Sequence, residues 1–309
     1  MKKYRVFLSV VMMTALLAAA TSAWAATAKG SSGQTETAAE TEASEIETQA
    51  SEPQTETVGP ETQVPGQQTE TAAPQTQEAG TKIEGEGYLT PQEALAAYIK
   101  GLQDNDFDEM MSVFAIESVA VNYDLARMVE RTRTYSASFG MIPNTDDLSV
   151  RLNIESRRKL AADIIKAHYL VLTESPLMEE GNYYEPKILS DEYESAQALV
   201  DELFIPSNGE LLKTIRFEDE YFSPAVLCTN YMNSNNLANI DRQAEVVHAQ
   251  GMTSVAARIY CNDKPYMLLM DAIQYGTKWY LYTGSGNLAN MLGVDISHQG
   301  LVPMDFLEQ

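Results

Sequence analysis

The chain has few of the residues that most enzyme sites use. Among its 309 residues are two cysteines, three histidines and two tryptophans. His168, His248 and His298 each lack a second metal ligand at helical spacing, and no Cys-x-x-Cys pair suggests zinc. The hydrolase motif G-x-S-x-G is also missing. We therefore expect no metal or other cofactor, although acid–base pairs built only from Asp, Glu or Tyr stay open.

Positive charge is scarce too. The chain has 21 Lys and Arg residues against 44 Asp and Glu residues, which gives a net charge of -23. Residues 1–25 contribute +3 and residues 26–86 contribute -10, so -16 remains for the rest. Such an acidic chain is unsuited to a phosphate backbone, and we expect no nucleic-acid partner.

Long apolar runs are missing except at the N-terminus. A basic start is followed by an apolar segment, 6–20, and by an A-x-A sequence that ends at Ala25. This order predicts a secretory signal peptide over residues 1–25, cleaved after Ala25. The run is short for a membrane-spanning helix, which needs about 20 residues, so an uncleaved anchor is the alternative. We expect a secreted or cell-surface protein with no membrane span in the mature chain and no lipid-modified cysteine.

Large apolar residues are rare in the next segment, 26–87. Thr, Glu, Gln, Ala, Pro and Gly dominate it, and "QTETA" or "QTETV" recurs three times at unequal spacing. A segment of this composition buries too little apolar surface to offset the entropy of ordering. We therefore predict a disordered linker over residues 26–87, followed by a single domain over 88–309.

Two helix starts open the predicted domain, in "YLTPQEALAAYIKGLQDNDFDEMMSVFA" at 88–115. Thr90 with Glu93 and Asp106 with Glu109 form capping boxes, each ahead of apolar residues at helical spacing. The acids at 104–109 imitate the start of a calcium loop, but glycine and glutamate are missing at the positions that an EF-hand requires. We interpret them as helix caps.

Helical spacing continues over 124–135, 153–172, 191–204 and 237–247, with a further start at 223–224. After Gly251 the period changes to two, and 253–261, 265–273 and 278–283 read as strands joined by short turns, with 211–217 as a fourth. Helices followed by a C-terminal antiparallel meander indicate an α+β fold.

Cys228 and Cys261 are the two cysteines. An even number in an exported chain favours a disulfide between them, and two free buried thiols are the alternative. A group of basic residues stands out from the acidic background: Arg127, Arg131, Arg133, Arg151, Arg157, Arg158 and Lys159. A solvated face paired with acids explains this group, and an anion site is the sharper interpretation. We interpret Asp271, within an apolar strand, as solvent-facing; if buried, it needs a partner or a raised pKa.

The segment 88–115, together with "YGTKWYLYTGSGNLANMLGV" at 275–294, resembles uncharacterised exported proteins of Gram-positive, gut-type bacteria. The first of these segments is also similar to the opening helices of nuclear transport factor 2-like, or cystatin-like, domains. The resemblance implies helices leaning on a curved antiparallel sheet that can close into a cone. It differs in one respect, because about 130 mostly helical residues separate the two segments here. It implies no catalytic residue.

Two functions follow from these observations. The first is an exported, non-enzymatic binding or interaction module of the cell exterior, with an unknown protein or cell-wall ligand as partner. The alternative is a small-molecule enzyme of the cone-fold type, with Tyr98, Tyr169 or Asp271 in a pocket between helix and sheet.

Overall fold

The computed structural model describes residues 82–136, 140–178, 188–191, 193–204 and 208–308. The predicted signal peptide, its cleavage after Ala25 and nearly all of the predicted linker lie outside these residues. The described α-helices are α2 (Pro91–Asp104), α3 (Phe107–Ser112), α4 (Glu117–Asn122), α5 (Leu125–Thr132), α6 (Asp147–Leu172), α7 (Ala196–Phe204), α8 (Pro224–Leu227), α9 (Ser234–Val246) and α10 (Asn287–Met291). Short 3-10 helices in the described part of the chain include η2 (Gly209–Thr214), η3 (Ile296–His298) and η4 (Met304–Glu308).

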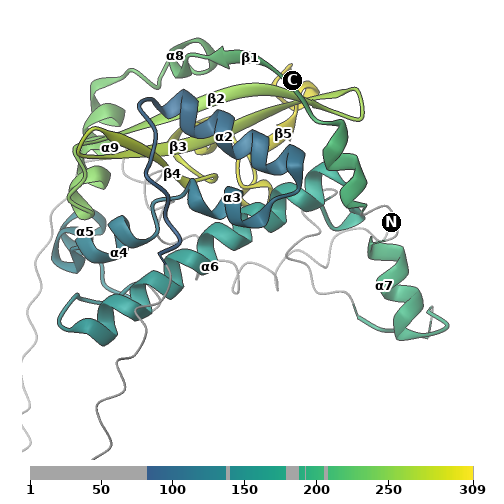
Figure 1. Cartoon of the computed structure of the whole chain (residues 1–309), viewed down its shortest axis with the longest axis horizontal. Helices are drawn as coiled ribbons and strands as arrows, with labels where there is room; N and C mark the ends of the chain where they lie inside the picture. The colour runs from purple at the N-terminus through teal and green to yellow at the C-terminus, as the bar shows by residue number, and fades with distance from the viewer. Residues whose placement is uncertain (1–81, 137–139, 179–187, 192, 205–207, 309) are drawn as a thin grey trace, which may run out of the picture. The chain divides into compact units, whose positions relative to one another are not determined.

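The strands are β1 (Arg216–Phe222), β2 (Gly251–Cys261), β3 (Lys264–Tyr275), β4 (Lys278–Thr283) and β5 (Leu301–Pro303). They form one antiparallel sheet in the order β1-β2-β3-β4, and β5 pairs with the first half of β3. The predicted α+β fold is confirmed, with helices first and an antiparallel meander at the C-terminal end (Figure 1).

Both faces of the sheet are buried. On one face, which we call the α2 face, alternate residues of β2 and β3 such as Val255 and Met270 pack against α2 and the second half of α6. On the other, the α9 face, residues such as Ala256 and Leu269 pack against α4, α9 and α10. The strongly apolar sequence of β3 therefore reflects burial on both faces.

The two edges of the sheet differ. The β4 edge is covered by the chain itself: Tyr88 and Trp279 exchange backbone hydrogen bonds of 2.8 and 2.9 Å, and Leu281 bonds to Val113 and Ala115. The β1 edge pairs with β2 alone among the described residues. Within the described part of the chain, β1 is therefore the open edge of the sheet.

The residues just before α2 bind to the domain through two carboxylates. Glu117 accepts from the backbone N–H groups of Ile83 and Glu84 at 2.7 and 2.9 Å. In return, Glu84 accepts from the Ser118 N–H and hydroxyl at 2.9 and 2.5 Å. Residues 83–85, which we assigned to the linker, thus already hydrogen-bond to the folded part.

Helix caps lie where the sequence placed them. Glu93 N–H donates to the Thr90 hydroxyl at 3.1 Å, and Glu109 N–H donates to Asp106 at 2.9 Å. Other boundaries differ. The helix expected to begin near residue 153 begins at 147, after a capping box of Asp146 and Ser149. The fourth strand expected over 211–217 is mostly a 3-10 turn, and β1 follows it at 216–222.

Candidate functional site

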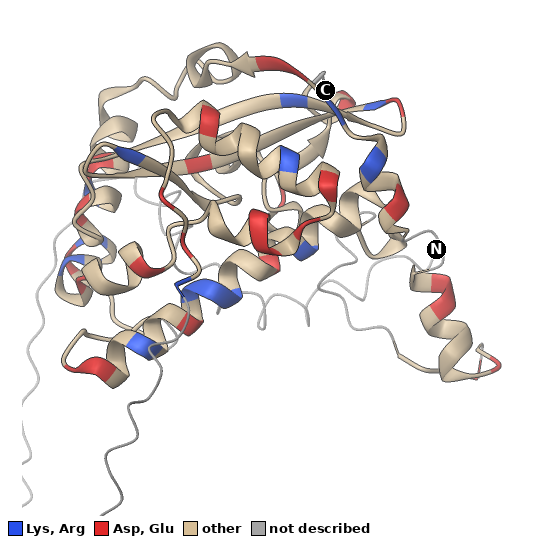
Figure 2. Ribbon diagram, in the orientation of Figure 1, with Lys and Arg blue, Asp and Glu red and all other residues tan. Residues whose placement is uncertain are grey.

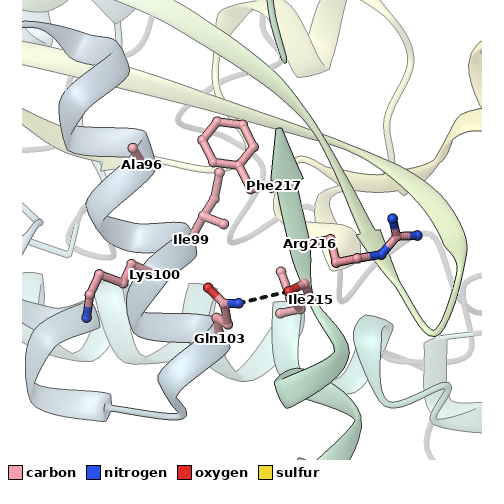
Figure 3. A pocket seen from close by; sticks show the side chains of 7 residues that line it. All are labelled: Ala96, Ile99, Lys100, Gln103, Ile215, Arg216 and Phe217. Carbon is pink, nitrogen blue, oxygen red and sulfur yellow. Dashed lines mark hydrogen bonds between the residues drawn. The ribbon is translucent and has the colours of Figure 1, made fainter. Parts of the chain in front are cut away.

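An open groove lies between α2 and the start of β1, with a volume of about 420 Å³. In Figure 3, Ile99 and Phe217 point toward each other across it, and Gln103 bridges to the backbone of Ile215. The amide of Gln103 donates to the Ile215 carbonyl at 3.1 Å. This hydrogen bond joins helix and strand, and Ile99, Ile215 and Phe217 supply the apolar part of the lining.

Two cations frame this groove. Lys100 and Arg216 point outward on opposite sides of it (Figure 3). Lys100 bonds to Asp104 at 2.5 Å, and the exposed Arg216 bonds to Asp263 at 2.9 Å and lies 5.1 Å from the Tyr260 ring centroid. A polar, charged rim around an apolar floor is the usual anatomy of a binding surface.

A second hollow, of about 270 Å³, continues the first along β1. Its walls come from the first turn of α2, the end of β1 and the middle of β2, and it is lined by Pro91, Gln92, Tyr221, Phe222, Ser223, Pro224, Thr253, Ser254 and Val255. The Tyr221 hydroxyl donates to the Gln92 carbonyl at 3.2 Å and ties strand to helix. Together the two hollows follow the open edge of the sheet.

Strand β1, which borders both hollows, has features that oppose pairing with other chains. Glu218 and Asp219 are exposed on β1, and Figure 2 shows acidic colour along this strand. Asp219 has a φ of 55°, and the register with β2 shifts between Phe217 and Tyr221. Bulges and charges of this kind keep an edge strand from pairing with other chains. The side chains of α2 and β1 thus border a groove along a strand whose own backbone is protected from pairing.

The space between α2 and the sheet, where a cone-type pocket would lie, is filled with side chains. Tyr98 and Phe114 are fully buried there, with ring centroids 5.6 Å apart. The Tyr98 hydroxyl donates to Nδ1 of His168 at 2.7 Å, and Nε2 of His168 donates to the Gln299 carbonyl at 2.9 Å. Burial lowers the pKa of His168 to about 4 and raises that of Tyr98 well above 10. This pair is a closed, neutral structural contact.

Asp271 lies on the other face of the sheet. It is 1% exposed, so our interpretation of a solvent-facing acid is wrong; the α9 face is covered by helices. Its carboxylate accepts from the Ser254 hydroxyl at 2.5 Å and from the Asn287 N–H and side-chain amide at 2.9 and 2.8 Å. Burial raises its pKa, and these bonds oppose the rise.

The glycines of "GSGN" explain how this contact forms. A Cβ on Gly286 would lie 2.3 Å from the Asp271 carboxyl carbon, and a Cβ on Gly284 would lie 1.8 Å from the Gln299 carbonyl oxygen. Only glycine lets the loop approach so closely. The motif therefore serves packing, and Tyr98, Tyr169 and Asp271 do not meet in one site.

Cys228 and Cys261 are both free thiols, so the predicted disulfide is not formed. Cys261 is buried with the core on the α2 face, whereas Cys228 packs against the cluster on the α9 face. The sheet between them keeps the two sulfurs apart. Burial raises the pKa of the Cys261 thiol, which makes it a poor nucleophile.

The basic residues singled out by the sequence divide into two sets. Arg127, Arg158 and Lys159 form ion pairs with neighbouring acids, as the solvated-face interpretation expects. Arg131 and Arg157 are partly or fully buried and have no ion pair among the described residues. Figure 2 shows basic colour along α6, which carries several of these residues.

The remaining candidates for metal or proton chemistry are dispersed. In the described part of the chain, no group of three or more His, Cys, Asp or Glu residues could hold a metal ion. His248 is exposed, 3.5 Å from Asp124, and Nε2 of His298 lies 3.2 Å from the Met178 carbonyl. Nor does any helix of the described residues combine the length and apolar character needed to cross a bilayer.

The sequence alone did not reveal the groove residues. Ala96, Ile99, Lys100 and Gln103 share one side of α2 through their i, i+3, i+4 and i+7 spacing, which was the available signal. Ile215 and Phe217, which we expected within one strand over 211–217, join them only through the tertiary fold. A groove between elements far apart in sequence has no local signature.

Comparison with known proteins adds a distant structural similarity. No protein-family model and no curated protein matches the chain. The crystal structure of a cystatin-like protein from Ruminococcus gnavus ATCC 29149 matches at 15% sequence identity and a TM-score of 0.33. The match covers 62% of this chain and 38% of that one, so the chain corresponds to well under half the length of this neighbour. At this score the similarity does not establish a shared fold.

Proposed function

We propose that the chain is an exported, non-enzymatic binding module that holds a protein or cell-wall ligand of the cell exterior in the groove between α2 and β1. The observation that carries this proposal is the groove itself: an apolar floor at Ile99, Ile215 and Phe217, with Lys100 and Arg216 at its rim. It lies beside the open edge of the sheet.

The arrangement of ionisable groups supports binding over catalysis. Tyr98, His168 and Asp271 are deeply buried groups with shifted pKa values, and each has its polar atoms occupied by hydrogen bonds. A general base needs a free path to the proton that it removes. The groove contains Lys100, Gln103 and Arg216 as its polar side chains, and none of these pairs with a nucleophile there.

Export rests on the sequence, through the signal peptide ending at Ala25 and the acidic segment that follows. A flexible linker over 26–87 would span roughly 40–45 Å and hold the module away from its anchoring point. Fractionation of cells and N-terminal sequencing test this part: the mature chain should begin at Ala26 and lie outside the membrane. A chain that starts at Met1 and stays with the membrane would overturn it.

Site-specific photocrosslinking tests the groove. A photoreactive phenylalanine analogue replaces Ala96, which lines the groove, or Ala196, which is exposed on α7 and serves as the matched control. In living cells, position 96 should yield discrete crosslinked species and position 196 should not. The same species from both positions, or none from position 96, would contradict binding in this groove.

A further inference from the structure

The second hollow, along the end of β1, differs in chemistry from the groove beside it. The groove has Lys100 and Arg216 at its rim, whereas none of the described residues that line the hollow is an Asp, Glu, Lys, Arg or His. Its volume of about 270 Å³ lies just below the range of about 300–1,000 Å³ that is usual for pockets of drug-sized ligands. The hollow therefore suits a small group without charge.

Alternation along the strands decides which side chains face this hollow. Tyr221 of β1 and Val255 of β2 pack with the core on the α2 face, whereas Phe222 packs on the α9 face. Thr253 lies two residues before Val255 on β2. Ser223 follows Tyr221 by two residues and is extended. Both of these side chains therefore point toward the α2 face as well, and they bring two hydroxyl groups to the hollow.

The ring of Tyr221 is held in place from two sides. Its hydroxyl donates to the Gln92 carbonyl at 3.2 Å, and its ring packs edge-on against Phe217 with centroids 5.4 Å apart. Tyr221 lines the hollow and Phe217 lines the groove, so the two rings lie where the hollow meets the groove. Tyr221 is only half-buried. An aromatic surface that is already ordered loses little entropy when a ligand stacks on it.

Three polar side chains around this ring have hydrogen-bonding capacity to spare. Ser223 is the N-cap of α8, yet its hydroxyl makes no capping bond. The Thr253 hydroxyl has a long contact of 3.4 Å to the Ser254 carbonyl. The side-chain amide of Gln92 is exposed and makes no hydrogen bond to the described residues. Each of these groups can both donate and accept.

A neutral sugar ring complements this lining. One face of a pyranose carries C–H groups that stack on an aromatic ring, and its edge carries hydroxyls that donate and accept. The net charge of -16 on the part of the chain that follows residue 86 disfavours an anionic ligand. A proline-rich peptide also stacks on aromatic rings, but its prolines lack N–H groups and would leave acceptors in the hollow unmatched.

We propose that the hollow beside Tyr221 binds one neutral sugar ring of a glycan, stacked on Tyr221 and hydrogen-bonded to Gln92, Ser223 and Thr253. The inference rests on the proposed function, because the hollow continues the groove between α2 and β1. It goes further in naming a glycan as the class of ligand.

Amide NMR of the full-length chain tests the proposal. The backbone N–H signals of Ser223, Thr253 and Val255 are followed during titration with triacetylchitotriose, and separately with cellotriose. They should shift and saturate with at least one of these sugars, while the signal of Gly276, at an exposed turn, should change little. Saturation by triacetylchitotriose alone would assign the site to acetamido sugars, and saturation by cellotriose alone to plain hexoses. Saturation by neither sugar would overturn the proposal.

A peptide distinguishes a glycan from a proline-rich segment. The probe is residues 58–66 of the chain itself, VGPETQVPG. It should leave the three signals of the hollow unchanged at concentrations at which the sugar saturates them. Tighter binding of the peptide than of either sugar would overturn the assignment to a glycan.

Variants test the individual contacts. Gln92→Met should weaken binding of the saturating sugar about fivefold, whereas Gln197→Met, a matched change at an exposed position of α7, should leave it within about twofold. Tyr221→Leu should bind the sugar about fivefold more weakly than Tyr221→Phe, since both lose the bond to the Gln92 carbonyl and only the first loses the ring. Equal affinity within either pair would contradict the proposal. If Tyr221→Leu fails to fold, the two glutamine variants decide.

The sugar titration and the crosslinking at Ala96 can fail separately. Discrete crosslinked species from position 96, without saturation by a sugar, would leave the binding module in place and refute its glycan ligand. Saturation by a sugar without crosslinked species would keep the sugar site and refute binding in the groove.

Discussion

The two faces of the sheet bury polar groups in different ways. On the α2 face, Tyr98 and His168 form a neutral pair whose atoms are all hydrogen-bonded. On the α9 face, Asp271 is equally well bonded, but Arg131 and Arg157 each keep a buried N–H without a partner. A fully bonded group is explained by stability alone. On the α9 face, by contrast, the Nε atoms of Arg131 and Arg157 are buried donors that the packing leaves without an acceptor among the described residues.

Among the changes that test this comparison, we expect the largest loss of stability from replacing Asp271. Asp271→Ala leaves the donors of Ser254 and Asn287 buried without an acceptor, and we expect a loss of about 3 kcal/mol in the free energy of unfolding. Urea denaturation measures it. Asp263→Ala, at an exposed turn, is the control and should change little. Equal stability of the two variants would show that the Asp271 network is not structural.

A pH effect of similar size is expected on the α2 face. His168 has a pKa of about 4 in the fold against 6.5 in the unfolded chain, so the unfolded state binds the proton more tightly. Stability should be constant above pH 6.5 and fall as the pH drops toward 4, by at most about 3 kcal/mol. Urea denaturation at a series of pH values measures this slope. It should diminish in His168→Gln and persist in His248→Gln; a slope unchanged in both would exclude His168 as the cause.

A smaller loss is expected from Gly286→Ala, which tests how closely the loop packs on Asp271. The new Cβ would lie 2.3 Å from a carboxyl group that three hydrogen bonds hold in place. Overpacking of this kind costs about 1–3 kcal/mol. Gly140→Ala is the matched control, because nothing lies within 4 Å of its added Cβ. Thermal unfolding of both variants should separate them, and equal melting temperatures would refute the close approach.

The smallest effect on stability is expected from Arg131→Met. This variant tests whether the two faces differ at all. Removing a half-buried charge that has no ion pair should change the free energy of unfolding by less than about 1 kcal/mol in either direction. Urea denaturation of the full-length chain provides the value. A loss as large as that of Asp271→Ala would mean that Arg131 is structural after all, which would remove the difference between the faces.

The sequence predicted elements whose signals are local. Thr90 and Asp106 were recognised as caps because their partners lie three residues away. The meander was recognised because alternation and short turns define it. The start of α6 was missed, since its capping box at Asp146 uses a serine at the third position in place of Glu or Gln.

The surroundings of the candidate site residues were less predictable, because the tertiary fold decides which of these side chains are buried. The arginine group was visible in the sequence, but nothing there separated Arg157 from its neighbour Arg158. In the fold, Arg157 is buried against β4, whereas Arg158 stays exposed and pairs with Glu155. Our interpretation of Asp271 as solvent-facing was wrong for the same reason. Helices α9 and α10 cover its face of the sheet, and the sequence does not show this packing.

The reciprocal bonds of Glu84 and Glu117 have a mechanical consequence. Any pull on the chain that precedes residue 83 reaches these bonds and the Tyr88–Trp279 backbone pair before it reaches α2. The load is then shared between the first turn of α4, which carries Glu117 and Ser118, and β4 in the sheet. In a domain tethered through its N-terminal segment, force would therefore enter at α4 and β4, whereas the groove lies between α2 and β1.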